Sequence, residues 1–119
     1  MEINVHERGG TVVVAVVGDL DWLSVPSLDS ELARAWRLGG EVVILDLSGV
    51  EFVDSSGVNS LVTAHRRAES EGRQLGIIDR GKIRKLLRRY GLDQLLMLGA
   101  TLDELLAGEP GQASSRDPL

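Results

Sequence analysis

The sequence predicts a single α/β domain whose mixed sheet has four to five strands and about four helices packed against it. Three observations predict this fold. The chain has 119 residues, the length of one domain. It begins with two β-rich runs separated by a glycine turn, and it then alternates apolar runs with amphipathic stretches of helical period. An opening hairpin followed by right-handed parallel crossovers gives a mixed sheet.

The opening hairpin comprises residues 2–6 and 11–17, with Arg8, Gly9 and Gly10 in the turn. The second run, TVVVAVV, is apolar along its length, so we expect it in the centre of the sheet. After GDLD at 18–21, Ser24 can cap a helix that has Pro26 in its first turn. The residues that share the apolar face of this helix are Leu28, Leu32, Ala35 and Trp36.

The second half of the chain continues the alternation. VVILDL at 42–47 predicts a buried strand, and SGVEFVDSSG at 48–57 leads into a helix that extends to about residue 71. QLGIID at 74–79 predicts the next strand, and LLML at 95–98 predicts a short last one. The expected core faces of the two helices in this half are Val58, Leu61, Val62, His65 and Ala68, and then Ile83, Leu86, Leu87 and Tyr90.

The residue pattern of the C-terminal region indicates where the domain ends. Thr101 and Glu104 have the spacing of a capping box, which predicts a last turn or two of helix through Leu102, Leu105 and Leu106. We therefore expect the domain to span residues 1–108, with residues 109–119 as a disordered tail.

Composition excludes several classes of function. Thirteen basic and eighteen acidic residues give a net charge of -5, which argues against direct binding to nucleic acid. The absence of cysteine excludes disulfides and thiolate chemistry, and it permits a reducing cytoplasm, where we expect the protein. No apolar run approaches the roughly 18 residues of a membrane span, so we expect none.

Catalytic and cofactor motifs are also missing. Two histidines and no cysteine leave a transition metal only carboxylates, and Gly81-Lys82 is followed by Ile83 where a phosphate-binding loop needs serine or threonine. His65 lies ten residues after Ser55 on the same expected helix, roughly 15 Å away, so it cannot activate that serine as a nucleophile. We expect no catalytic residue, no metal and no cofactor, and hence no enzyme.

The segment VDSSG at 53–57 stands at the start of the second helix. Asp54 can cap that helix, Ser55 and Ser56 place two hydroxyls at its first turn, and Gly57 adds no side chain. Plain helix capping is one interpretation of these residues, and a functional site is the other.

The segment DLSGVEFVDSSGVNSLVTAHRRAESEG at 46–72 resembles the signature of STAS domains of the anti-sigma factor antagonist family, in which a strand ends in a DSSG or DSTG turn that opens a helix. GDLD at 18–21 is similar to the family's GELD or GDLD segment, and the resemblance covers about 108 residues. It implies that Ser55 is phosphorylated by a partner that is both a serine kinase and an anti-sigma factor.

The same resemblance implies which residues contact the partner. Asp54 and Ser56 match the motif, and Asp21 falls where the family keeps an acidic residue beside the phosphorylation site. Two positions depart from the pattern: Asn59 stands where a glycine is common, and Trp22 stands where polar residues are frequent, either as an interface anchor or as a core residue. The expected partner-binding residues are Asp21, Trp22, Asp54, Ser56, Gly57 and Asn59.

The resemblance thus implies an anti-sigma factor antagonist. The unphosphorylated chain binds the kinase and frees the sigma factor, phosphorylation of Ser55 dissolves the complex, and a metal-dependent serine phosphatase resets the switch. The alternative is a constitutive scaffold, because STAS domains also occur as stressosome-type subunits and as accessory subunits of lipid-transport ATPases.

Overall fold

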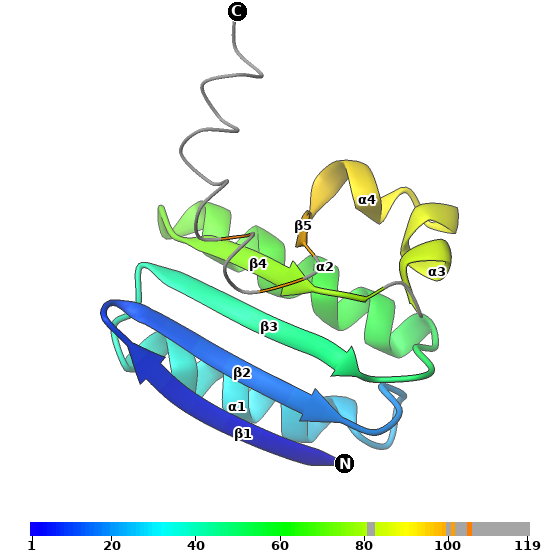
Figure 1. Cartoon of the computed structure of the whole chain (residues 1–119), viewed down its shortest axis with the longest axis horizontal. Coiled ribbons are helices and arrows are strands. Elements are labelled where there is room, and N and C mark those ends of the chain that lie inside the picture. The colour runs from blue at the N-terminus through cyan, green and yellow to red at the C-terminus, as the bar shows by residue number, and fades with distance from the viewer. Residues whose placement is uncertain (81–82, 100, 102–104, 106–119) are drawn as a thin grey trace, which may run out of the picture.

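The computed structural model describes residues 1–80, 83–99, 101 and 105. Five strands and four helices form one α/β domain, the fold class that the sequence predicted (Figure 1). The elements in chain order are β1 (Glu2–Arg8), β2 (Thr11–Val17), α1 (Val25–Arg37), β3 (Val42–Gly49), α2 (Ser55–Ser70), β4 (Gln74–Ile78), α3 (Arg84–Arg89), α4 (Leu92–Leu95) and β5 (Met97–Gly99).

The five strands form one mixed sheet in the order β1-β2-β3-β4-β5. β1 is antiparallel to β2 because Gly9 and Gly10, with φ angles of 53° and 86°, form a two-residue turn between them. The pairs β2-β3, β3-β4 and β4-β5 are parallel. The carboxyl ends of β2, β3 and β4 therefore meet at one edge of the sheet, where their arrowheads point in Figure 1.

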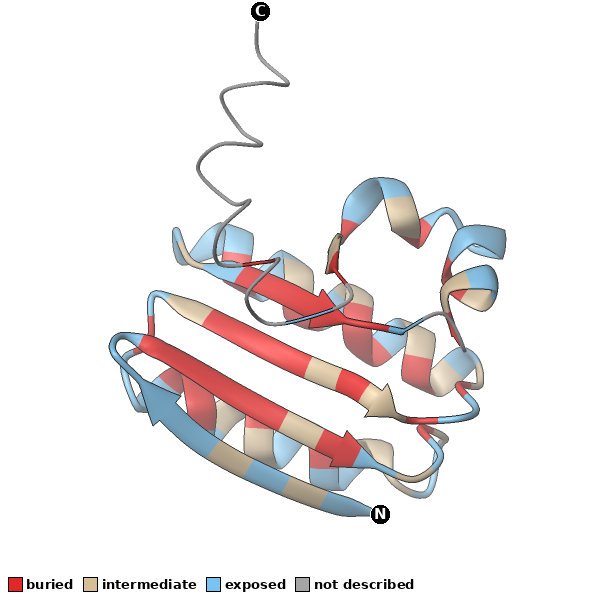
Figure 2. Cartoon of the chain, viewed as in Figure 1, coloured by how far each residue is buried: buried red, intermediate tan, exposed pale blue. Residues whose placement is uncertain are grey.

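The main core lies between the sheet and its helices. Alternate strand residues, among them Val14 on β2 and Leu45 on β3, point to the helices and are fully buried. The predicted face of α1 is confirmed, since Leu28, Leu32, Ala35 and Trp36 are all buried. Figure 2 shows this burial concentrated in the central strands and on the helix sides that face them.

The predicted face of α2 is confirmed in part, because the buried side of the helix also includes small residues that were not predicted. The buried residues of α2 are Gly57, Ser60, Leu61, Ala64 and Ala68. Of the predicted residues, Leu61 and Ala68 are buried, and Val58 and Val62 are half-buried and pack against the core, whereas His65 is half-buried and is not a core residue. Small residues on the buried face bring the helix close to its neighbours, and the buried Ser60 hydroxyl donates a hydrogen bond to the Asp29 carboxylate of α1 at 2.7 Å. Counting large apolar side chains could not identify such a face.

Two residues of the expected C-terminal helix lie among the described residues. The backbone N–H of Leu105 donates to the Thr101 carbonyl at 3.2 Å, which has the i to i+4 spacing of a helical hydrogen bond. Leu105 is buried against Val13, Ile44 and Ile78 on the sheet face opposite α1 and α2. Glu104, Leu102, Leu106 and the expected tail at 109–119 lie outside the described residues. The short helix α4 was not predicted, because four residues are too few to show a period.

Candidate functional site

Two loops lie side by side at the carboxyl edge of the sheet. They are the β2–α1 loop at 18–24 and the β3–α2 loop at 50–54, which together we call the loop pair. The Leu20 N–H donates to the Phe52 carbonyl at 2.8 Å, and the Asp54 N–H donates to the Leu20 carbonyl at 3.0 Å. These bonds form an isolated parallel bridge between Leu20 and Val53. The pairing of β2 with β3 thus continues beyond the ends of both strands and fixes the two loops together.

The Asp54 carboxylate joins the loop pair to α2. Asp54 is the N-cap of α2, and its Oδ1 accepts a hydrogen bond from the Gly57 N–H at 2.9 Å, as the capping interpretation predicted. Its Oδ2 accepts a second bond from the backbone N–H of Trp22 at 3.1 Å. One side chain therefore satisfies two amides, one in the first turn of α2 and one in the β2–α1 loop.

Gly57 is required at its position by sterics. A Cβ atom there would lie 2.6 Å from the Leu20 carbonyl oxygen and 2.7 Å from the Val53 side chain. The first turn of α2 packs directly on the backbone of the β2–α1 loop, so any side chain at residue 57 would push the two apart.

Asp21 and Ser24 build the turn that leads into α1. The Asp21 Oδ1 accepts hydrogen bonds from the N–H groups of Leu23 at 3.2 Å and Ser24 at 3.1 Å. The Ser24 hydroxyl accepts from the Asp21 N–H and donates to the Asp19 carbonyl. Ser24 occupies the N-cap position, but the expectation that its side chain caps the helix was wrong, because the hydroxyl is engaged by the preceding turn. Asp21 thus lies within the loop pair, and its carboxylate stabilises its own turn.

The other expected site residues on α2 are exposed or half-buried. Ser55 is the first residue of α2 and is exposed, and its hydroxyl makes no hydrogen bond within the described part of the chain. Ser56 is half-buried, and Asn59 is exposed one turn further along. The Ser55 hydroxyl lies at the positive end of the helix dipole, where a negative group is favourable.

Three large apolar side chains are exposed on the loop pair. Trp22 is 68% exposed, Leu23 70% and Phe52 52%, and we call them the apolar patch. The core interpretation of Trp22 was therefore wrong: its backbone N–H is bound to Asp54, and the buried face of α1 begins only at Leu28. Sequence reasoning missed Leu23 and Phe52. The sequence did contain a signal, namely a large apolar residue outside the pattern of core positions. Leu23 precedes the apolar stripe of α1, and Phe52 lies between Val50 and Val53, which are buried.

The groups that a catalytic or metal site would need are not gathered here. His65 lies in the second half of α2, ten residues beyond Ser55, and its ring faces Glu69 at 3.6 Å. Among the described residues there is no group of three or more histidine, cysteine, aspartate or glutamate side chains that could hold a metal ion. Within the same residues, no helix has the length and apolar character needed to cross a membrane.

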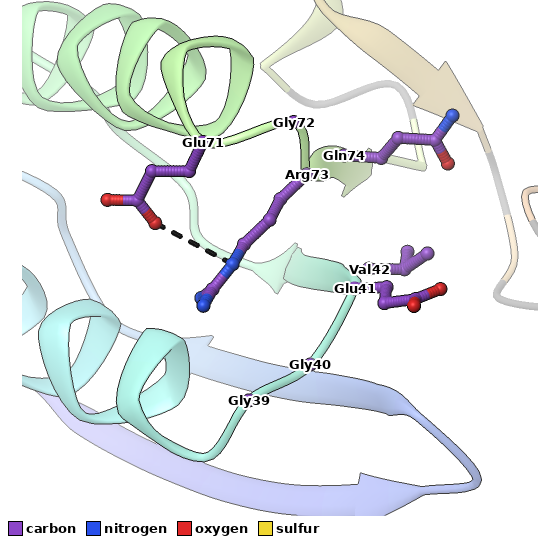
Figure 3. Close-up of a pocket in the computed structure, with 8 residues that line it drawn as sticks. All are labelled: Gly39, Gly40, Glu41, Val42, Glu71, Gly72, Arg73 and Gln74. Atoms are coloured by element: carbon purple, nitrogen blue, oxygen red, sulfur yellow. Dashed lines mark ion pairs between the residues drawn. The ribbon is translucent and has the colours of Figure 1, made fainter.

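A polar hollow of about 560 Å³ lies at the opposite edge of the sheet, before the first residues of β3 and β4 (Figure 3). Its charged groups are Glu41, Glu71 and Arg73, of which Glu71 and Arg73 form an ion pair at 3.6 Å. Arg73 also donates to the Trp36 carbonyl at 2.7 Å and stacks over the Trp36 ring. These contacts give Arg73 a structural role, and the hollow is remote from the loop pair. Ligands of parallel sheets bind at the carboxyl edge, which is the edge of the loop pair.

Comparison with known proteins identifies the fold and its family. Residues 3–99 match the protein family described as "Mlab, STAS domain". The chain belongs to the STAS domain family. The loop pair is thus the region of this STAS domain that connects β2 to α1 and β3 to α2.

Several relatives of this STAS domain are anti-sigma factor antagonists. The anti-sigma-F factor antagonist RsfB of Mycobacterium tuberculosis is 26% identical over 110 residues, which are 92% of this chain and 89% of that protein. An anti-sigma factor antagonist from Mycobacterium paratuberculosis is 29% identical with a TM-score of 0.82, over 90% of this chain and 92% of that one. SpoIIAA of Bacillus in its phosphorylated form shares the fold, with a TM-score of 0.66 and 23% identity over 89% of this chain and 97% of that one.

Replacing Asp54 separates its two structural roles. We expect Asp54→Ala to lower the free energy of unfolding by about 1 to 2 kcal/mol, because the cap is lost, and to accelerate hydrogen exchange of the Trp22 amide. Asp54→Asn is the matched control: its amide oxygen still accepts from Gly57, but its NH₂ group cannot accept from Trp22. Urea unfolding and amide exchange measure the two effects. Equal exchange of the Trp22 amide in all three proteins would contradict the bridging role.

Proposed function

We propose that this STAS domain is an anti-sigma factor antagonist that binds a serine-kinase anti-sigma factor through the loop pair and is released when Ser55 is phosphorylated. The observation that carries the proposal is the exposed Ser55 hydroxyl at the start of α2, directly after the loop pair that carries the apolar patch. The homology to RsfB supports the same role. The proposal treats the chain as a substrate and a binding module, and not as an enzyme.

The apolar patch supplies the binding energy in this proposal. Exposed aromatic and aliphatic side chains on a rigid surface are the usual anchors of protein interfaces. Trp22, Leu23 and Phe52 lie on loops whose backbones are hydrogen-bonded to each other, so little conformational entropy is lost when a partner covers them. We place Asp21, Asp54, Ser56, Gly57 and Asn59 in the same interface, with Asp54 and Gly57 acting through the loop conformation they hold.

A phosphate on Ser55 changes this surface without unfolding it. Phosphorylation adds a charge of about -1.5 to -2 at pH 7. At the first turn of α2 that charge meets the positive end of the helix dipole, which favours it by about 0.3 to 1 kcal/mol. A docked partner, by contrast, would have to desolvate a dianion that adjoins Asp54. A penalty of about 2.7 kcal/mol is enough to weaken binding a hundredfold.

The other parts of the cycle come from partners in this proposal. The kinase supplies ATP, the metal and the catalytic base, and a metal-dependent serine phosphatase removes the phosphate. We place the protein in the cytoplasm, with the activity in residues 1–108 and a dispensable tail at 109–119.

A constitutive scaffold or accessory subunit is the competing function. The structural roles of Asp54 and Gly57 favour the scaffold function. The helix cap formed by Asp54 and the close packing of Gly57 on the Leu20 backbone explain half of the DSSG motif without phosphorylation. The two functions differ in whether partner binding responds to charge at residue 55.

Charge at residue 55 is the first test. We expect Ser55→Asp to weaken binding to the kinase about tenfold and phosphoserine to weaken it about a hundredfold, because the desolvation cost rises with the charge. Ser55→Ala should bind as the wild type does but resist release by ATP. Isothermal titration against each purified anti-sigma kinase of the source organism measures these affinities.

The control for this test is Ser70→Asp, which adds the same charge at the other end of α2 and should leave binding unchanged. Equal affinities for Ser55→Asp and Ser55→Ala would contradict the switch. Stable binding to a partner that ignores both ATP and residue 55 would instead support the scaffold function.

The apolar patch is the second test. We expect Leu23→Ala to weaken kinase binding about tenfold or more, because Leu23 is an exposed anchor on the loop pair. Leu38→Ala is the matched control, since Leu38 is also exposed but follows the last turn of α1 at the far edge of the sheet. Equal losses of affinity in the two variants would show that the loop pair is not a specific part of the interface. Circular dichroism confirms that both variants fold.

A further inference from the structure

Among the residues that the structure describes, the strand β1 pairs only with β2, which leaves the other side of its backbone open. It is the first strand in the order of the sheet. It is seven residues long, whereas β5, at the other edge, has three. An open strand edge is a template for pairing with a further strand.

The turn between β1 and β2 determines which amides face outward. In a two-residue turn the flanking residues form a hydrogen-bonded pair, and here these are Arg8 and Thr11. Because hydrogen-bonded and non-hydrogen-bonded positions alternate in antiparallel strands, the even-numbered residues of β1 bond to β2. The N–H and C=O groups of Ile3, Val5 and Glu7 therefore point away from the sheet.

The charges of β1 complement those of a second, antiparallel β1. When Val5 lies opposite Val5 of a second copy, Glu2 lies opposite Arg8 and Ile3 lies opposite Glu7. In this register every outward-facing amide meets an outward-facing amide. Glu2 and Arg8 then occupy a non-hydrogen-bonded pair, the position at which cross-strand side chains approach most closely. Asn4 of one copy lies opposite His6 of the other, and this polar pair stands between the Glu2–Arg8 pair and the two-fold axis.

A hollow beside the edge suits the same arrangement. It has a volume of about 480 Å³, and Ile3, Ser27 and Ser30 contribute to its lining. Glu7 of a second copy, opposite Ile3, would enter this hollow, where the Ser27 and Ser30 hydroxyls can donate to its carboxylate. Glu31, which also lines the hollow, is paired with Arg34 at 3.1 Å, so its charge is compensated.

We propose that β1 is a self-association surface whose partner is a second copy of this chain, joined as antiparallel β1 strands in one continuous sheet. The opposite charges at the two ends of β1 favour the antiparallel copy, whereas a parallel copy would place Glu2 against Glu2. The two-fold axis at Val5 places the loop pairs of the two copies at opposite ends of the strands, because β1 begins where β2, β3 and β4 end (Figure 1). Both Ser55 sites stay open, and the inference does not depend on the proposed function.

Charge reversal tests the register. We expect the wild type, with any affinity tag removed, to show a monomer–dimer equilibrium by sedimentation at low salt. Glu2→Arg and Arg8→Glu should each weaken the dimer about tenfold, because each variant turns two attractive pairs into repulsive ones. The double variant restores both pairs with reversed sign and should recover the wild-type dissociation constant to within about threefold. Recovery in the double variant is not expected if the single variants merely damage the hairpin.

Amide exchange provides the second measurement. We expect the Val5 amide to become protected as the protein concentration rises, whereas the Asn4 and His6 amides, bonded to β2, are protected at every concentration. A chain that stays monomeric at millimolar concentration, with a freely exchanging Val5 amide, would overturn the proposal and leave this edge to a strand of another protein. A dimer that ignores both single charge variants would also overturn it.

Discussion

The Asp54 carboxylate is the interaction on which the rest of the site depends. It binds the Gly57 amide of its own helix and the Trp22 amide of the neighbouring loop, so the start of α2 and the β2–α1 loop share one anchor. Gly57 makes this arrangement possible, because any larger residue would separate the helix from Leu20. Without the carboxylate, the exposed Trp22 amide would turn to water, the amide of the buried Gly57 would lose its partner, and the hydrogen bonds left between the two loops would be those of the Leu20 backbone.

This anchor divides the DSSG motif into two kinds of residue. Asp54 and Gly57 point inward and fix the backbone, whereas Ser55 projects outward with its hydroxyl available. A charge added at Ser55 therefore alters the surface that a partner meets while the contacts that hold the fold stay in place. The same anchor keeps Trp22 and Leu23 exposed, since it binds the loop by its backbone and leaves the side chains free of the core. In this account the apolar patch and the modifiable serine act together because one rigid element presents both.

Local patterns in the sequence predicted the elements well. The four core residues of α1, the interior position of β2 between β1 and β3, and the capping role of Asp54 each follow from spacing or residue type within a few positions. Long-range geometry was harder to predict. The buried face of α2 is composed of small residues, and only its packing against Asp29 and the β2–α1 loop shows why it is buried. The second bond of Asp54 joins residues 32 positions apart, and no local pattern contains it. Ser24 has the residue type and position of a cap, yet the turn before it engages its hydroxyl.

The central claim is that Ser55 is the residue through which the protein is switched. Its most direct test is site-mapped mass spectrometry of the purified chain after incubation in an ATP-supplied lysate of its source organism, with Ser55→Ala in parallel. The account predicts a single phosphate on Ser55 that is absent from the variant. An unmodified Ser55, in a lysate where another STAS protein does become phosphorylated, would contradict it and leave the DSSG segment as a helix cap.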